Sequence, residues 1–153
     1  MKRSGFTMIE LIFVIVILGI LAAVAIPRLA ATRDDAQASK IAANAKTMVS
    51  EIAAYATAQG SIPLDDANLS LASNTYNENI TSGYMSLGGT AGTDANISIK
   101  DKSTGGTPCV YVDVNSTTIQ TTHNASGTSA ISTAVKAIVP EANVSIAGSN
   151  VVR

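Results

Sequence analysis

Residues 1–31 read MKRSGFTMIELIFVIVILGILAAVAIPRLAA, and this stretch decides how the chain begins to fold. From Leu11 to Ile26 it has sixteen residues with no charged or strongly polar side chain. Together with the residues before Leu11 the apolar run reaches about 21 residues, and only Thr7 and Glu10 interrupt it. A helix needs about 20 residues to cross a bilayer, so the run predicts a single membrane-spanning helix.

Three kinds of export segment share such a run, and the residues at its start favour one of them. An ordinary signal peptide would be cut near residues 23–25, Ala-Val-Ala, and an uncleaved anchor would not be cut at all. The third kind is cut on the cytoplasmic side, before the apolar run. Gly5 favours this kind because a small residue separates the basic leader, with Lys2 and Arg3, from the apolar run. Glu10 favours it too, because a carboxylate inside a membrane span is costly and indicates a function.

Residues 5–11, Gly-Phe-Thr-Met-Ile-Glu-Leu, resemble the cleavage and methylation motif of prepilins, the family of type IV pilins and type II secretion pseudopilins. That motif has a glycine, a hydrophobic first mature residue, and a glutamate four positions after that residue. The resemblance implies that a membrane-embedded prepilin peptidase removes the leader peptide, residues 1–5, by cutting the Gly5–Phe6 bond. It implies further that the peptidase methylates the new Phe6 amine, and that Glu10 meets the Phe6 amine of a neighbouring subunit as a filament grows.

The physical chemistry of Glu10 agrees with that role. In apolar surroundings a lone carboxylate and a lone ammonium are each penalised, whereas a pair cancels much of the penalty and fixes one register between subunits. The alternative is a carboxylate near the membrane interface, where the helix dipole stabilises it by about 0.3–1 kcal/mol. We expect the pairing role.

Gly19 and Pro27 stand where the same family carries a glycine and a proline in its long helix. Both residues are also common in membrane helices without a special role. Pro27 removes a backbone donor and clashes with the preceding turn, so we expect a kink near residues 23–27. The resemblance implies in addition that the stretch between Gly19 and Pro27 unwinds in an assembled filament.

Beyond the membrane-spanning half, residues 6–30, the sequence predicts that the helix continues as an amphipathic half over residues 31–60. One face carries Ala31, Asp34, Ala38, Ile41, Ala45, Met48, Ile52 and Tyr55, and the opposite face carries only polar residues: Arg33, Gln37, Lys40, Asn44, Thr47 and Glu51. Gly60 and Pro63 end the helix. A helix from Phe6 to Gln59 would be about 80 Å long. The apolar face of its second half needs a domain to cover it.

Residues 61–153 provide that domain. Segment 61–95 is rich in Ser, Asn, Thr, Asp and Gly and predicts an irregular surface chain. Spaced apolar side chains would pin it to the core: Leu64, Leu69, Leu71, Tyr76, Ile80, Tyr84, Met85 and Leu87.

Alternating patterns predict strands at 96–100 and 108–114 and, after a turn at 115–116, a hairpin partner at 117–121. A short helix is predicted at 129–139, with an apolar face made of Ile131, Ala134, Val135 and Ile138, and the last strands at 143–146 and 150–152. The predicted fold class is α+β, with the long N-terminal helix packed on a small C-terminal antiparallel sheet.

Composition offers no clear signal for several function classes. The formal net charge is −1, from ten basic and eleven acidic residues, so there is no basic excess for nucleic acid. Cys109 is the only cysteine and lies in an apolar stretch, which predicts a buried thiol and excludes an intrachain disulfide. His123 is the only histidine, in a Thr/Asn-rich run that we expect to be a solvated loop. We therefore expect no enzyme activity, because zinc sites and the usual Ser/His and Cys/His arrangements lack their residues.

We expect no cofactor either. Calcium is a weak alternative, because some pseudopilins bind it in a C-terminal loop and this region holds oxygen ligands: Asp94, Asn96, Asp101 and Asp113. Their spacing matches no calcium motif such as the EF-hand loop. The adjacent pairs Asp34-Asp35 and Asp65-Asp66 are typical of solvated surface.

These observations together predict a structural subunit of a pilus-like filament. The lone cysteine favours a pseudopilin of a secretion or DNA-uptake system, because many major pilins carry a C-terminal cysteine pair. The alternatives are a major or minor type IV pilin and, from another class, a secreted or membrane-anchored binding domain. The basic leader predicts one pass through the bacterial inner membrane, with the C-terminal domain in the periplasm. Expected partners are membrane lipid, the prepilin peptidase, an inner-membrane assembly platform and other pilin-like subunits.

Overall fold

The computed structural model describes residues 5–90, 92–101 and 106–146 of the 153-residue chain. The described elements follow in the order α1 (Met8–Gln59), α2 (Asp66–Ala72), α3 (Asn74–Thr81), β1 (Met85–Gly88), β2 (Asp94–Asp101), β3 (Thr107–Asn115), β4 (Thr118–His123), α4 (Ala130–Ile138) and β5 (Ala142–Ser145). The chain divides into two compact units, residues 1–35 and 36–153, and α1 contributes to both. The predicted α+β class is confirmed.

In the first unit the chain forms the N-terminal part of α1. The helix starts at Met8, two residues after the predicted start, and continues through Gly19 and Pro27 without interruption. It contains an 18-residue stretch that by length and composition can cross a membrane, and none of that stretch is buried. An exposed apolar surface of this size marks a contact with lipid or with other proteins. A bend at Pro27 stays a prediction.

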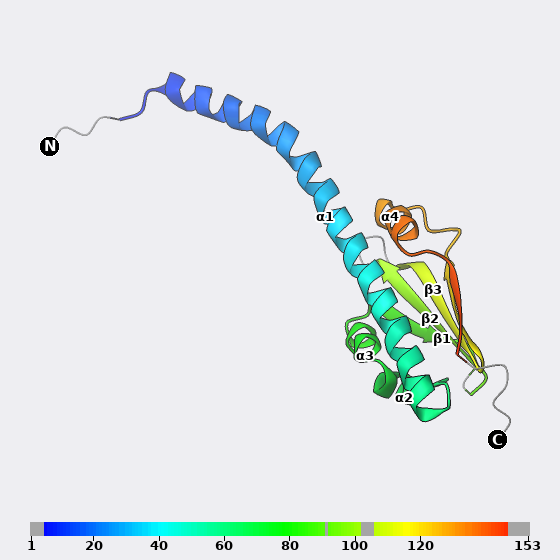
Figure 1. Ribbon diagram of the computed structural model, residues 1–153. Helices are drawn as coiled ribbons and strands as arrows, with labels where there is room; N and C mark the ends of the chain where they lie inside the picture. Colours follow the sequence, from blue (N-terminus) through cyan, green and yellow to red (C-terminus); the bar gives the residue numbers. More distant parts are fainter. Residues whose placement is uncertain (1–4, 91, 102–105, 147–153) are drawn as a thin grey trace. The chain divides into compact units, whose positions relative to one another are not determined.

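In the second unit five strands form one antiparallel sheet in the order β1-β2-β3-β4-β5 (Figure 1). Strands β3 and β4 are joined by the two-residue loop Ser116-Thr117, so the predicted hairpin is confirmed. A register shift between Ile99 and Lys100 interrupts the pairing of β2 with β3. The predicted strand at 150–152 lies outside the described residues.

The core lies between the sheet and the second half of α1. This half of α1 buries Ala38, Ile41, Ala42, Ala45, Met48, Ile52 and Ala56. The strands bury alternating residues, which are Ala95, Ile97, Ile99, Val110, Val112, Val114 and Ile119. Most of the predicted apolar face of the helix is therefore confirmed. Tyr55 is only half-buried, however, and Ala56 takes the buried place one position later.

The prediction of an irregular chain over 61–95 was wrong. This segment contains α2, α3 and β1, which are short elements with a high content of Ser and Asn. Capping explains the helices: the Asp65 side chain accepts from the backbone N–H of Asn68, and the Ser73 side chain accepts from that of Tyr76. Side-chain oxygens at these positions satisfy the first free N–H groups of each helix, so residues that are typical of loops start helices instead.

Two apolar residues do not pack as predicted. Leu71 is 75% exposed on α2, whereas Leu69 on the same helix is buried. On α4, Ile138 is 39% exposed and the small side chain of Ser132 is buried beside Ile131 and Val135. On α4 the predicted helical periodicity was correct and the orientation of the helix toward the core was not. Leu71 was expected to pin an irregular chain to the core, but it lies on a helix, where residues two positions apart do not share a face.

Candidate functional site

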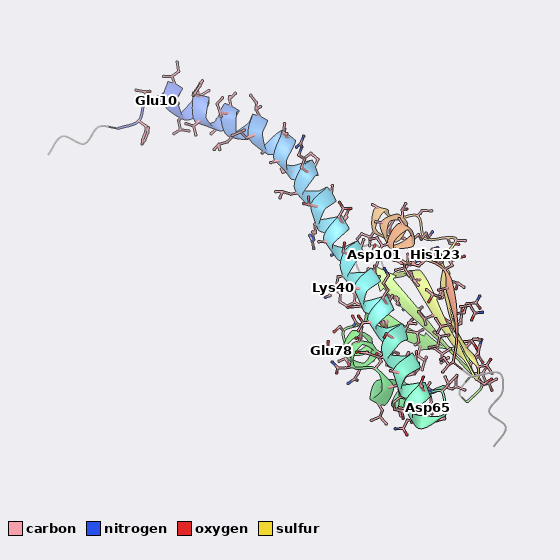
Figure 2. All side chains as sticks on the ribbon, in the orientation of Figure 1. Glu10, Lys40, Asp65, Glu78, Asp101 and His123 are labelled. Carbon is pink, nitrogen blue, oxygen red and sulfur yellow. The ribbon has the colours of Figure 1, made fainter. Side chains whose placement is uncertain are left out.

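The start of α1 is a capping box made of Thr7 and Glu10 (Figure 2 shows Glu10). Glu10 Oε2 accepts hydrogen bonds of 2.7 Å from both the backbone N–H and the hydroxyl of Thr7. In return the Thr7 hydroxyl oxygen accepts from the Glu10 N–H at 3.4 Å, and the Thr7 carbonyl accepts from the N–H of Leu11 at 3.3 Å. This is the Thr-x-x-Glu arrangement that satisfies free donors at a helix start. Thr7 was missed at the sequence level, although the spacing alone signals it.

The predicted scissile bond, Gly5–Phe6, lies just before this cap. Gly5, Phe6 and Thr7 are not helical, and all three are exposed, with Phe6 89% exposed. A peptide bond outside a helix keeps its backbone groups available, so a peptidase can bind it without first unwinding α1. The cap fixes the boundary between the non-helical leader end and the helix.

Gly19 and Pro27 lie within the exposed apolar part of α1. A Cβ added at Gly19 would have nothing within 4 Å among the described residues, so the glycine is not required for packing within the subunit. Pro27 has no N–H to donate to the preceding turn, which weakens the helix locally. Both positions are thus compatible with the predicted unwinding.

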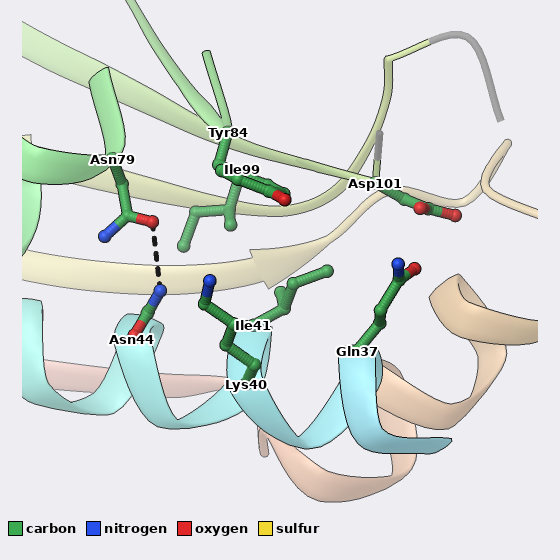
Figure 3. A pocket seen from close by; sticks show the side chains of 8 residues that line it. All are labelled: Gln37, Lys40, Ile41, Asn44, Asn79, Tyr84, Ile99 and Asp101. Atoms are coloured by element: carbon green, nitrogen blue, oxygen red, sulfur yellow. Dashed lines mark hydrogen bonds between the residues drawn. The ribbon is translucent and has the colours of Figure 1, made fainter. Parts of the chain in front are cut away.

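The polar face of the second half of α1 is partly covered by other elements of the second unit. Asn44 Nδ2 donates to Asn79 Oδ1 of α3 at 3.0 Å, and Lys40 Nζ lies 5.1 Å from the centre of the Tyr84 ring (Figure 3). Gln37, Ile99 and Asp101 complete the walls of a small pocket beside these contacts (Figure 3). The pocket is lined by the helix that supports the domain, and its contacts serve to hold that helix.

Glu51 makes two further contacts between α1 and the start of α3. Its Oε2 atom accepts from the Ser73 hydroxyl at 2.5 Å and from the Thr75 N–H at 3.2 Å. Ser73 is itself the N-cap of α3, so one carboxylate on α1 fixes the start of α3. A negative charge at a helix N-terminus is also favoured by the helix dipole.

Cys109 and His123, which the sequence analysis singled out, both lie among residues of the folded domain. Cys109 is buried, as predicted, and burial raises the pKa of its thiol. His123 is not in a solvated loop: it ends β4, and its Nε2 atom lies 2.6 Å from the carbonyl oxygen of Val139. Its Nδ1 atom lies 3.6 Å from a carboxylate oxygen of Glu141, so the side chain joins β4 to the segment that leads into β5.

The four oxygen-bearing residues considered for calcium are not brought together. Asn96 and Asp113 face each other across β2 and β3 and are hydrogen-bonded, whereas Asp94 and Asp101 stand at opposite ends of β2. In the ranges that the structure describes, no three His, Cys, Asp or Glu side chains lie close enough to hold a metal ion.

Comparison with known proteins finds one matching family model and two similar proteins. Residues 1–26 match the family described as "Prokaryotic N-terminal methylation motif". The chain is 37% identical over 106 residues to the fimbrial protein EcpC of Eikenella corrodens, in an alignment that covers 67% of this chain and 65% of the relative. It is 41% identical over 66 residues to the type IV narrow pilus major component PilA5 of Thermus thermophilus, covering 43% of this chain and 57% of the relative. No solved structure matches the chain.

Proposed function

We propose that the chain, whose residues 1–26 match the prokaryotic N-terminal methylation motif and which is similar to two pilus proteins, is a membrane-anchored subunit of a pilus-like filament. The chain spans 65% and 57% of the lengths of the two relatives, so its assembly and partners are part of this proposal. One observation carries the proposal: an accessible Gly5–Phe6 bond lies directly before a capped helix that carries Glu10 and a wholly exposed apolar surface.

The first step of the proposed pathway is processing at the membrane. A prepilin peptidase cuts the Gly5–Phe6 bond on the cytoplasmic side and methylates the Phe6 amine. Removal of residues 1–5 also removes Lys2 and Arg3, which leaves eight basic against eleven acidic residues, a balance of 8 − 11 = −3. The single span then holds the subunit in the inner membrane, with the C-terminal domain in the periplasm.

The second step is assembly, in which Glu10 pairs with the Phe6 amine of a neighbouring subunit. In the isolated subunit Thr7 already donates two hydrogen bonds to Oε2 of this carboxylate, which lowers the cost of keeping it in an apolar environment. Within the described residues, Oε1 makes no hydrogen bond and is available to an ammonium. A subunit leaving the membrane on an assembly platform thus exchanges lipid for helix contacts and gains one charge pair.

The relatives favour a pilus over a secretion system as the machine that this subunit serves. One is named a fimbrial protein and the other a major component of a narrow type IV pilus. The second candidate is a pseudopilin of a type II secretion or DNA-uptake system, and the single cysteine favours it.

Deletion and complementation in the native bacterium test this proposal. Fibres sheared from wild-type cells should contain the chain by immunoblot and lose it in the deletion strain. Loss of secreted proteins or of DNA uptake without loss of surface fibres would support the second candidate. If the chain never enters a sedimentable fibre, even when overproduced, the filament role is wrong.

A further inference from the structure

Four asparagines of the C-terminal domain share a five-residue pattern. Each has an acidic residue two positions before it and a Ser or Thr two positions after it: Asp-Ala-Asn-Leu-Ser at 66–70, Asp-Ala-Asn-Ile-Ser at 94–98, Asp-Val-Asn-Ser-Thr at 113–117 and Glu-Ala-Asn-Val-Ser at 141–145. Asn-x-Ser/Thr is the acceptor signal for N-glycosylation. One class of bacterial oligosaccharyltransferase requires, in addition, a carboxylate two positions before the asparagine.

The pattern is enriched in this chain. There are six Asn-x-Ser/Thr triplets in the sequence, and four of them carry the preceding carboxylate. Asn79 and Asn124 lack it, because Asn77 and Thr122 occupy the position. Since only eleven of the 153 residues are acidic, this coincidence of carboxylates and triplets is far above what their frequency predicts.

The structure separates the four patterns into two groups. In the first group the acceptor amide is already used: Asn68 Nδ2 donates to Oδ2 of Asp65, the N-cap of α2, at 2.8 Å, and Asn96 Nδ2 donates to Asp113 between the neighbouring strands β2 and β3. A transferase must free the amide and bind several residues around it. For Asn68 and Asn96 it would have to break these bonds and open a helix or a central strand.

In the second group the acceptor is open to an enzyme. Asn115 is the last residue of β3 and is followed by the exposed hairpin loop Ser116-Thr117. Its own amide is not engaged, but Asp113 of its pattern accepts the bond from Asn96, so a transferase would have to break that bond and open the end of the β3–β4 hairpin. Asn143 lies on β5, which among the described strands pairs only with β4 at the edge of the sheet, and all five residues of its pattern are exposed. Neither amide donates a hydrogen bond to another described residue.

Both acceptors lie on the face of the sheet that points away from the core. Val114 is buried, so its neighbour Asn115 points to the opposite face. Asn143 is paired with Gln120, which is paired with Asp113 on the same outer face. A bulky polar group on this face disturbs neither the core nor the packing of the second half of α1.

From these observations we propose that Asn115 and Asn143 are N-glycosylated by a bacterial oligosaccharyltransferase and that Asn68 and Asn96 are not. The donor is an oligosaccharide linked to a polyprenyl diphosphate. The new bond joins Asn Nδ2 to C1 of the first sugar, the C1–O bond to the diphosphate breaks, the diphosphate leaves with that electron pair, and Nδ2 loses one proton. The proposal rests on the proposed function in one respect, which is that the domain is exported to the side where such enzymes act.

The test is to produce the full-length chain in a bacterium that carries an oligosaccharyltransferase of this specificity and its lipid-linked donor. A known acceptor protein in the same cells reports that transfer is active, and protease accessibility of the domain in spheroplasts reports export. Glycopeptide mass spectrometry should find the oligosaccharide on Asn115 and Asn143 and none on Asn68, Asn96 or Asn124. The Asn115→Gln and Asn143→Gln variants should each lose one oligosaccharide from the intact mass.

The carboxylate is tested by Glu141→Gln, which should remove most of the oligosaccharide from Asn143 and leave Asn115 unchanged. If an exported chain carries no sugar at Asn115 and Asn143 while the control acceptor is modified, the proposal is wrong and the filament role is unaffected. If Asn68 and Asn96 are modified equally, the structural selection is wrong. A domain that stays inaccessible to protease would instead contradict the proposed export.

Discussion

At the scale of single residues, Glu10 has one observed role, in the cap with Thr7, and one proposed role, in pairing with a neighbouring subunit. A carboxylate in an apolar run indicates a function, which is why this residue was singled out. The Thr-x-x-Glu spacing signals a cap at Thr7, and the structure shows the bonds that form it. Capping and intersubunit pairing therefore make different predictions for the two residues.

Replacing Glu10 with Ala should leave membrane insertion intact and lower fibre yield by about tenfold or more, since an unpaired Phe6 ammonium in the filament core costs several kcal/mol. Thr7→Ala removes only the cap, worth about 1 kcal/mol, and should lower the yield less. Sheared-fibre immunoblots, normalised to the membrane-bound subunit, measure both. Equal losses in the two variants would mean that Glu10 acts only as a cap.

Cys109 should be unreactive in the folded protein. The thiol is fully buried, and burial raises its pKa, so little thiolate forms at pH 8. An aromatic disulfide reagent should modify the Cys109 thiol of the native protein at less than about a tenth of the rate in denaturant. Only the small population of molecules that exposes the thiol reacts. Because the unfolded chain releases this proton first, the free energy of unfolding should also fall as the pH rises above the ordinary thiol pKa of about 8.5. Rapid labelling of the native protein would contradict the buried assignment.

At the scale of elements, the long helix and most strands could be predicted from the sequence, because periodicity is a local property. The apolar run, the three-and-four spacing of residues 38–52 and the alternation of Val110, Val112 and Val114 each identify one element. Helices α2 and α3 could not be predicted this way. They are short and polar, and their stability comes from caps and from contacts with α1 that lie far apart in the sequence.

A substitution at Glu51 measures how much the contacts between α1 and α3 contribute to the free energy of unfolding. Glu51→Ala leaves the Ser73 hydroxyl and the Thr75 N–H without their acceptor, and should lower the free energy of unfolding by about 1–3 kcal/mol. The melting temperature of the detergent-solubilised chain, followed by far-ultraviolet circular dichroism, should fall by several degrees. Thr47→Ala, one turn earlier at an exposed position, serves as the control and should change it little. An unchanged melting temperature for Glu51→Ala would show that α3 does not depend on this carboxylate.

At the scale of the whole molecule, the two units differ in how much apolar surface they expose. Residues 8–35 carry an exposed apolar surface, and residues 36–146, as far as they are described, enclose a core. The predicted site residues Gly5, Phe6 and Glu10 all lie within residues 5–10 of the first unit. Such a site can be proposed from the sequence because it consists of neighbouring residues, and its cleavage and pairing roles stay predictions. The domain is harder to predict because its packing joins residues that lie far apart in the sequence.

The central claim is that the chain is processed as a prepilin, and the mass of its mature N-terminus tests it most directly. The protein is purified from membranes of the native bacterium, and its intact mass and N-terminal peptide are measured. We predict a chain that begins at Phe6 with one methyl group on its amine. A chain that begins at Ile26, as after ordinary signal-peptide cleavage, or that retains residues 1–5 would contradict the account.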